Sequence, residues 1–221
     1  MSLPKTIEDK LQEGRTYRDI DVSQIEVREA GDEGEPQKMV EGYATTFDSK
    51  YLLYGWEDYE VWEQIDKNAF ADCDMDDVIM QYNHEGRVFA RTGNGTLTLE
   101  TNDTGLKVLA NLGGTEIGRQ LFEEIKGGYT NKMSFGFKVA EDKREVVSDH
   151  ERNKTVVTRT ITKISKLYDV SAVSLPANDA TSISARSFGA GVVAEIVQEL
   201  RKRDQQKQRI RILSLYRGTK P

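Results

Sequence analysis

The 221-residue sequence has few of the features that mark several large classes of protein. Cys73 is the only cysteine, which excludes an intramolecular disulfide and a cysteine-based metal site. No segment approaches the run of about 20 apolar residues that a membrane-spanning helix needs. The N-terminal residues lack the apolar region of a secretory signal. These absences predict a cytoplasmic protein with no membrane partner.

Histidine is also scarce, so histidine-dependent chemistry must use His84 or His150. His84 follows the apolar residues 78–80 and lies in the corner Asn-His-Glu-Gly, where a rigid strand end can hold a functional side chain. His150 lies in the charged run Ser-Asp-His-Glu-Arg, which is typical of a solvent-exposed turn. His84 is therefore the candidate base, and a turn histidine that caps a strand is the alternative.

The charge is unevenly distributed along the chain. The net charge is −6, but residues 186–221 contain nine Lys or Arg and three acids, a formal charge of +6, which leaves −12 for residues 1–185. An acidic body with a basic tail indicates two segments with different roles. Together with the polar start of the chain, this divides the sequence into an arm (residues 1–22), a central domain (23–186) and a basic tail (187–221) with an amphipathic helix. We expect the tail to be a removable targeting element, and a solvated basic helix that ends the domain is the alternative.

Short apolar alternations separated by turn residues predict that the central domain is mostly β. The pattern predicts strands at residues 25–29, 39–47, 61–65, 78–82, 88–92, 96–100, 106–110, 132–141, 156–164 and 167–175. One helix is predicted at 115–126, where apolar residues recur every four positions before Gly127. We therefore expect an α+β fold in which an antiparallel barrel or sandwich carries added helices.

Ser134 is the candidate nucleophile. In the segment Lys-Met-Ser-Phe-Gly-Phe (132–137), strand alternation places Met133, Phe135 and Phe137 on one face and Ser134 and Gly136 on the other. Gly136 would leave space beside the hydroxyl for a substrate backbone, which makes Gly136 and Phe135 candidate substrate contacts. A serine without a base is no nucleophile, so an ordinary outward-facing strand residue is the alternative.

Asp169 is the candidate acid that orients the histidine. It lies in the apolar run Leu-Tyr-Asp-Val-Ser-Ala-Val (167–173), where a charge is costly unless it has a partner. The alternatives are an exposed position on the sheet and an ion pair with a nearby lysine.

Several segments, in the same order, resemble the prohead protease family of tailed phages. They are Gly-Tyr-Ala-Thr-Thr-Phe (42–47), Glu-Gln-Ile-Asp-Lys-Asn-Ala-Phe (63–70), Asn-His (83–84), Met-Ser-Phe-Gly-Phe (133–137), Asp-Val-Ser (169–171) and Pro-Ala-Asn (176–178). Asn68 stands where the family usually has glycine, and Asp169 stands where it often has glutamate.

The resemblance implies that Ser134 and His84 are the catalytic pair and that Asp169 is the third member. It also implies a β-barrel, closed or partly closed and flanked by helices, similar to herpesvirus assemblin, with no metal or organic cofactor. The implied activity is serine endopeptidase cleavage of the scaffold segments of capsid precursors inside the immature phage head, with self-cleavage and self-association. Nucleic acid is not expected as a partner.

Two other functions remain open. One is a protease-like assembly or scaffolding factor without catalysis, and the presence of a serine, a histidine and an acid argues against it. The other is a barrel that binds a small molecule, in which replacing Ser134 would be harmless.

Overall fold

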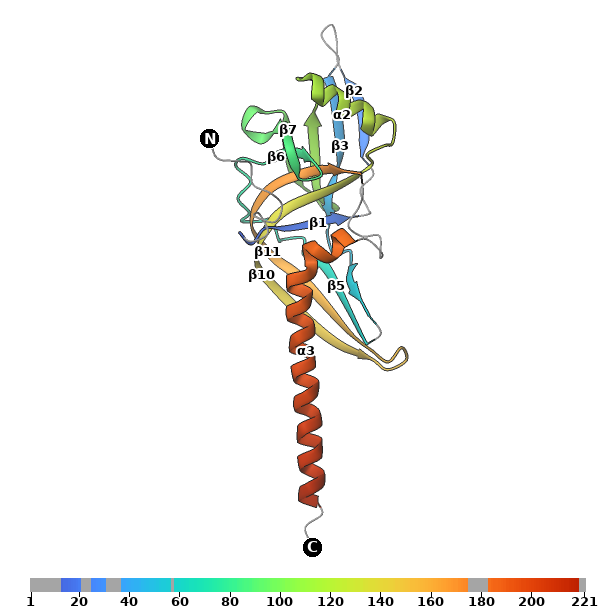
Figure 1. The fold of residues 1–221 in the computed structure, drawn as a ribbon. Helices are drawn as coiled ribbons and strands as arrows, with labels where there is room; N and C mark the ends of the chain where they lie inside the picture. Colours follow the sequence, from blue (N-terminus) through green and yellow to red (C-terminus); the bar gives the residue numbers. More distant parts are fainter. Residues whose placement is uncertain (1–12, 21–24, 31–36, 57, 175–182, 219–221) are drawn as a thin grey trace.

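The computed structural model describes residues 13–20, 25–30, 37–56, 58–174 and 183–218. Residues 1–12 of the predicted arm and the Pro-Ala-Asn segment at 176–178 lie outside these ranges. The described residues form two sheets and two α-helices, with one 3₁₀ turn at Thr92–Asn94 (Figure 1). This confirms a mostly β, α+β fold.

The larger sheet has seven strands and is built around one long hairpin. Its main path runs β1–β10–β11–β5–β4, with β6 beside β11 and β7 beside β6. The strands are β1 (Thr16–Ile20), β4 (Tyr51–Gly55), β5 (Tyr59–Ile65), β6 (Ile79–Tyr82), β7 (Glu85–Arg91), β10 (Lys132–Asp149) and β11 (Lys154–Val173). The hairpin β10–β11 thus carries most of the other strands.

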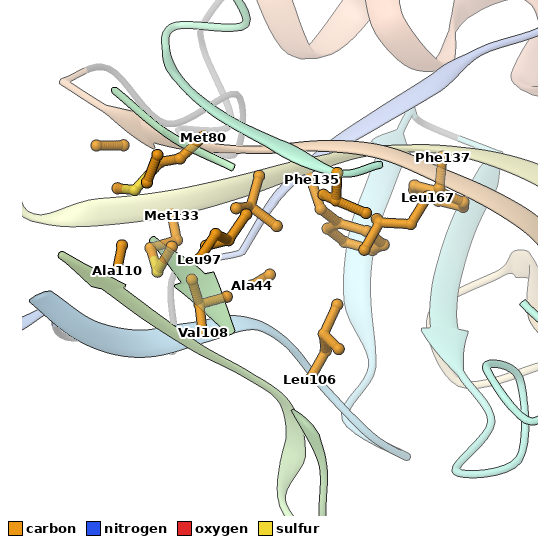
Figure 2. Packing of buried hydrophobic residues seen from close by; sticks show 14 of the residues in the cluster. Ala44, Met80, Leu97, Leu106, Val108, Ala110, Met133, Phe135, Phe137 and Leu167 are labelled. Carbon is orange, nitrogen blue, oxygen red and sulfur yellow. The ribbon is translucent and has the colours of Figure 1, made fainter. Parts of the chain in front are cut away.

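The smaller sheet has four strands in the order β2–β3–β9–β8. These are β2 (Glu26–Ala30), β3 (Gln37–Thr46), β8 (Leu97–Thr101) and β9 (Gly105–Asn111), all paired antiparallel. The main core lies between the two sheets, and Figure 2 shows Met133, Phe135 and Phe137 of β10 close to Leu106 and Val108 of β9. Burial of each large apolar side chain stabilises the fold by about 1.5–3 kcal/mol, so this layer holds β10 firmly in place.

Two helices complete the fold. α2 (Glu116–Lys126) begins after Thr115, whose hydroxyl accepts a hydrogen bond from the Gly118 N–H, and buries Leu121, Phe122 and Ile125. α3 (Ile183–Gly218) extends from the body as a long rod (Figure 1). α3 spans the part of the tail, around residues 192–200, for which the sequence predicts an amphipathic helix.

The apolar face of α3 is used within the molecule. Ile196 and Leu200 pack against Val61 and Val157 of the sheet, while the side chains at 201–210 are exposed. The basic stretch 201–210 is thus exposed on every side of the helix.

The strand pairing does not close the predicted antiparallel barrel. Within the described ranges the pairing gives two sheets and no closed ring, and β11 pairs parallel with both β5 and β6. Antiparallel pairs form most readily between strands that follow one another along the chain, whereas these parallel pairs join strands far apart in the sequence. In addition, β1 lies within the predicted polar arm and β4 was not predicted.

Candidate active site

His84 is held in a tight turn between β6 and β7. Asn83 and His84 have φ values of 48° and 61°, and the flanking Tyr82 and Glu85 are paired. Positive φ at both central residues suits the two-residue hairpin turns that follow the twist of the strands, and Asn and His tolerate this region better than most residues. The Asn83 N–H donates to the Ala172 carbonyl at 3.0 Å, which fixes the turn against β11.

Ser134 and Asp169 are brought together by the register of the β10–β11 hairpin. Ser134 pairs with Ser171, and Gly136 pairs with Asp169, so all four residues share one face of the sheet. The register shifts directly after Gly136. Bulges bend a strand and redirect its side chains, and here the bend lies next to the buried carboxylate.

The His84 ring bridges the serine and the acid. Its Nε2 lies 2.5 Å from the Ser134 Oγ, and its Nδ1 contacts the Asp169 Oδ1. The exposed fractions of His84, Ser134 and Asp169 are 3%, 0% and 1%. A hydroxyl, an imidazole and a carboxylate in series, shielded from water, can move a proton from the hydroxyl to a histidine whose cation the acid stabilises.

Gly136 provides room for the acid. A Cβ at this position would lie 2.4 Å from the Asp169 Oδ2 and 2.6 Å from the Tyr17 Cε1, closer than real side chains pack. The space that the sequence suggested for a substrate is therefore filled by Asp169 and Tyr17. Phe135, the other predicted substrate contact, is fully buried and stacks on Phe137. In this structure Phe135 therefore packs in the hydrophobic core.

Ser171 is a site residue that the sequence pattern did not single out. Its Oγ accepts a hydrogen bond from the His84 backbone N–H at 3.2 Å and donates to the Asp169 Oδ1 at 3.2 Å. One hydroxyl thus ties the histidine turn to the acid. Its position two residues after Asp169, on the same strand face, is the signal that could have identified it.

The strand β1 covers the site, which the sequence also did not predict. The Tyr17 ring lies against the His84 ring, with 4.4 Å between the centroids, and the Ser134 Oγ lies 2.9 Å from the Arg18 carbonyl oxygen. Burial, followed by the nearby Asp169 carboxylate, raises the pKa of Tyr17, so its phenol stays neutral. Ser134 therefore lies on the predicted face of β10 but is buried rather than outward-facing.

The described residues offer little support for other kinds of site. Burial raises the pKa of the Cys73 thiol to about 11, which leaves it protonated at neutral pH. No group of three His, Cys, Asp or Glu side chains in the described ranges is arranged to hold a metal ion. Within the same ranges, every helix is too short or too polar to cross a membrane.

Comparisons with known proteins identify a family for this chain. No curated protein sequence matches the chain. Among solved structures, the bacteriophage T4 capsid assembly protease, gp21, is similar with a TM-score of 0.42 and 11% sequence identity, over 72% of this chain and 96% of that one. A family model described as caudovirus prohead serine protease matches residues 23–195, more than half of the sequence. The chain therefore belongs to the caudovirus prohead serine protease family.

Proposed function

We propose that this chain is a serine endopeptidase in which Ser134 is the nucleophile, His84 the general base and Asp169 the orienting acid. The observation that carries the proposal is the His84 ring, which contacts the Ser134 Oγ through one nitrogen and the Asp169 carboxylate through the other. In this arrangement the histidine is oriented by the acid and is within reach of the proton that it must remove.

The reaction takes place in two stages. The Ser134 Oγ attacks the carbonyl carbon of the scissile peptide bond while the His84 Nε2 takes the hydroxyl proton, and the Nδ1–H remains bonded to Asp169. The histidine then gives this proton to the departing amine, which leaves an acyl-serine. Water, activated by the same histidine, releases the carboxylate product and restores the Ser134 hydroxyl.

The substrates in this proposal are the scaffold segments of capsid precursors, cut within the immature phage head in the host cell. Family membership supports this class of substrate and this location. Self-association and self-cleavage are part of the proposal, and so is a barrel-like arrangement of the two sheets. Because Ile196 and Leu200 pack on the sheet, we place a tail-removing cut beyond Leu200, where the helix is exposed.

Incubation with the capsid precursor encoded by the same phage tests the activity. Ser134→Ala should abolish cleavage and preserve the fold, because it removes one oxygen from a packed position. Ser148→Ala is the matched control, since Ser148 is an exposed serine on the same strand. Equal cleavage by Ser134→Ala would favour another nucleophile, and no cleavage by any form would favour the assembly factor without catalysis.

The same incubation tests self-cleavage. Mass spectrometry should detect a shortened chain in the active protein and an intact chain in Ser134→Ala. An intact tail in both proteins would rule out its removal by this site.

A further inference from the structure

The strand β1 occupies the position that an extended substrate needs. It pairs antiparallel with β10, with Arg18 opposite Phe135 and Asp19 opposite Ser134. The Arg18 carbonyl oxygen lies 2.9 Å from the Ser134 Oγ. Attack on a peptide bond requires its carbonyl carbon to come within about 3–3.5 Å of the nucleophile. The Arg18 carbonyl is the β1 carbonyl that the Ser134 hydroxyl contacts through its oxygen, so Arg18 corresponds to the residue before the cut bond.

This contact also interferes with the catalytic hydrogen bond. The Ser134 hydroxyl has one hydrogen and two acceptors within reach, the His84 Nε2 at 2.5 Å and the Arg18 carbonyl at 2.9 Å. When the hydrogen points to the carbonyl, it is not positioned for transfer to the histidine. A bound β1 therefore blocks the nucleophile and also competes with its base.

The Arg18 side chain fills a buried, anionic subsite. Its Nε and Nη2 donate to the two Glu63 carboxylate oxygens at 2.5 and 3.2 Å, and the Tyr51 hydroxyl donates to the same carboxylate at 2.6 Å. Glu63 is fully buried. Burial opposes the charge of Glu63, but Arg18 and Arg159 outweigh it and lower the pKa of the carboxyl.

Glu63 keeps one cationic partner when Arg18 leaves, and the group that remains (Glu63, Arg159 and Asp142) carries a net negative charge that favours an incoming cation. The Arg159 Nη1 donates to the second Glu63 oxygen at 2.6 Å, so the carboxylate retains a partner. A lysine or arginine from another segment could then replace Arg18. An acidic side chain could not, because it would repel the Glu63 carboxylate, and an apolar side chain would remove the two hydrogen bonds that Arg18 donates to it.

We propose that β1 is a pseudosubstrate strand, which occupies the edge of β10 on which an extended substrate segment binds. Arg18 then marks a subsite at Glu63 that selects a basic residue before the scissile bond. The family match begins at residue 23, after β1 ends at Ile20, so β1 lies outside the part of the chain that the family model matches. This inference rests on the proposed function, because it requires Ser134 to be the nucleophile.

The first test measures exchange of the strand by binding alone. Full-length Ser134→Ala is mixed with a peptide copying residues 16–22 (Thr-Tyr-Arg-Asp-Ile-Asp-Val), and amide hydrogen exchange is followed at residues 16–20. We expect exchange to rise as the peptide displaces β1, and to stay unchanged with the same peptide carrying Arg18→Glu. Unchanged exchange at a saturating concentration of the first peptide would overturn the proposal.

The second test measures selectivity. Peptides copying residues 16–22, with Arg, Lys, Leu or Glu at position 18, are incubated with the full-length protein. We expect kcat/KM for Arg and Lys to exceed that for Leu and Glu by about tenfold or more, the range of a hydrogen bond to a charged group. Cleavage that depends on Ser134 but shows no basic preference would overturn the subsite and leave the proposed function intact.

The third test measures release of the site. Arg18→Glu places a like charge against Glu63 and should raise cleavage of the Lys peptide about tenfold or more. Arg28→Glu makes the same charge change at an exposed position on β2 and should leave cleavage unchanged. A folded Arg18→Glu protein no faster than this control would show that β1 is only a structural strand. No cleavage that depends on Ser134 by any form would instead count against the proposed function, and the exchange measurement would still test β1.

Discussion

Two buried polar clusters meet β1, one on each side of the strand, and they differ in how fully they are paired. On one side, Tyr17 covers the cluster of Ser134, His84 and Asp169. On the other side, Arg18 joins a charged cluster, the buried ion network, whose other members are Glu63, Tyr51, Arg159 and Asp142.

The buried ion network is satisfied at its centre. Each Glu63 oxygen accepts at least two hydrogen bonds, and Arg159 continues the chain to Asp142. In the catalytic cluster the Asp169 Oδ2 has no hydrogen-bond partner among the described residues, and His84 has positive φ. Buried polar atoms are normally paired, so such exceptions are expected at functional sites. The difference in pairing supports the proposals that the first cluster serves chemistry and that the second serves stability and selection.

After Ser134→Ala, the largest effect should come from His84→Ala, which removes the ring that joins the serine to the acid. We expect peptide cleavage to fall by about 10⁴-fold or more. His150→Ala replaces the other histidine, which is exposed, and should have no effect. Because the cluster acts as one unit, the double variant Ser134→Ala/His84→Ala should be no slower than either single variant. A double variant much slower than either single variant would contradict the idea that the cluster acts as one unit.

Asp169→Asn should have the next largest effect. The amide keeps the shape of the carboxylate but cannot stabilise the imidazolium, so we expect kcat to fall by about 10²–10⁴-fold. Asp103→Asn, in the exposed turn between β8 and β9, is the matched control. Full activity of Asp169→Asn would mean that another group orients His84, and Ser171 would then be the nearest candidate.

The sequence predicted much of the catalytic cluster because its members are marked locally. An acid in an apolar strand, a histidine in a tight turn and a serine opposite an apolar strand face are each visible within a few residues. Asp169 is less obvious than the other two, and the resemblance to the family was needed to connect all three. The mostly β class followed from the same short alternations.

The buried ion network could not be predicted in this way. Arg18, Glu63 and Arg159 lie on three strands, and only the parallel pairing of β5 with β11 places Glu63 opposite Arg159. Each charge looks like a surface residue in its own segment, since local patterns do not reveal non-local partners. For the same reason β1 was interpreted as part of a polar arm.

Glu63→Gln tests the stabilising role of the ion network. The change leaves two buried guanidinium groups without their shared carboxylate, and we expect the free energy of unfolding to fall by about 3–5 kcal/mol. Denaturant unfolding at pH 7 measures this. Glu100→Gln, on an exposed position of β8, should leave stability unchanged. A similar loss in both variants would mean that the network contributes nothing specific.

The stability difference between wild type and Glu63→Gln should also depend on pH. Arg18 and Arg159 overcome the effect of burial and lower the pKa of Glu63 in the folded state. The stabilising effect is therefore fully present above the ordinary glutamate pKa of about 4.3 and is lost as pH falls through the lower folded value. The stability difference between wild type and Glu63→Gln should shrink in strong acid. A difference that grows as pH falls would have the wrong sign for a paired carboxylate.

The smallest effect should come from Ser171→Ala. The hydroxyl contacts the His84 backbone N–H, the His84 Nδ1 and the Asp169 Oδ1, each at 3.2 Å. A neutral hydrogen bond stabilises by about 0.5–1.5 kcal/mol, so we expect kcat to fall about 2–10-fold while KM is unchanged. A lower kcat with an unchanged KM distinguishes a positioning residue from one that binds substrate.

Ser165→Ala provides the control for that last change, because Ser165 is on the same strand and donates only to the Lys138 carbonyl at 3.2 Å. It should leave both kcat and KM unchanged. A further readout is the pH profile of kcat: if Ser171 positions the histidine that accepts the serine proton, its loss should shift the profile. A rise in KM with an unchanged kcat and an unchanged pH profile would mean that Ser171 acts in substrate binding. The positions of His84 and Asp169 would then depend on their turn and strand and not on the Ser171 hydroxyl.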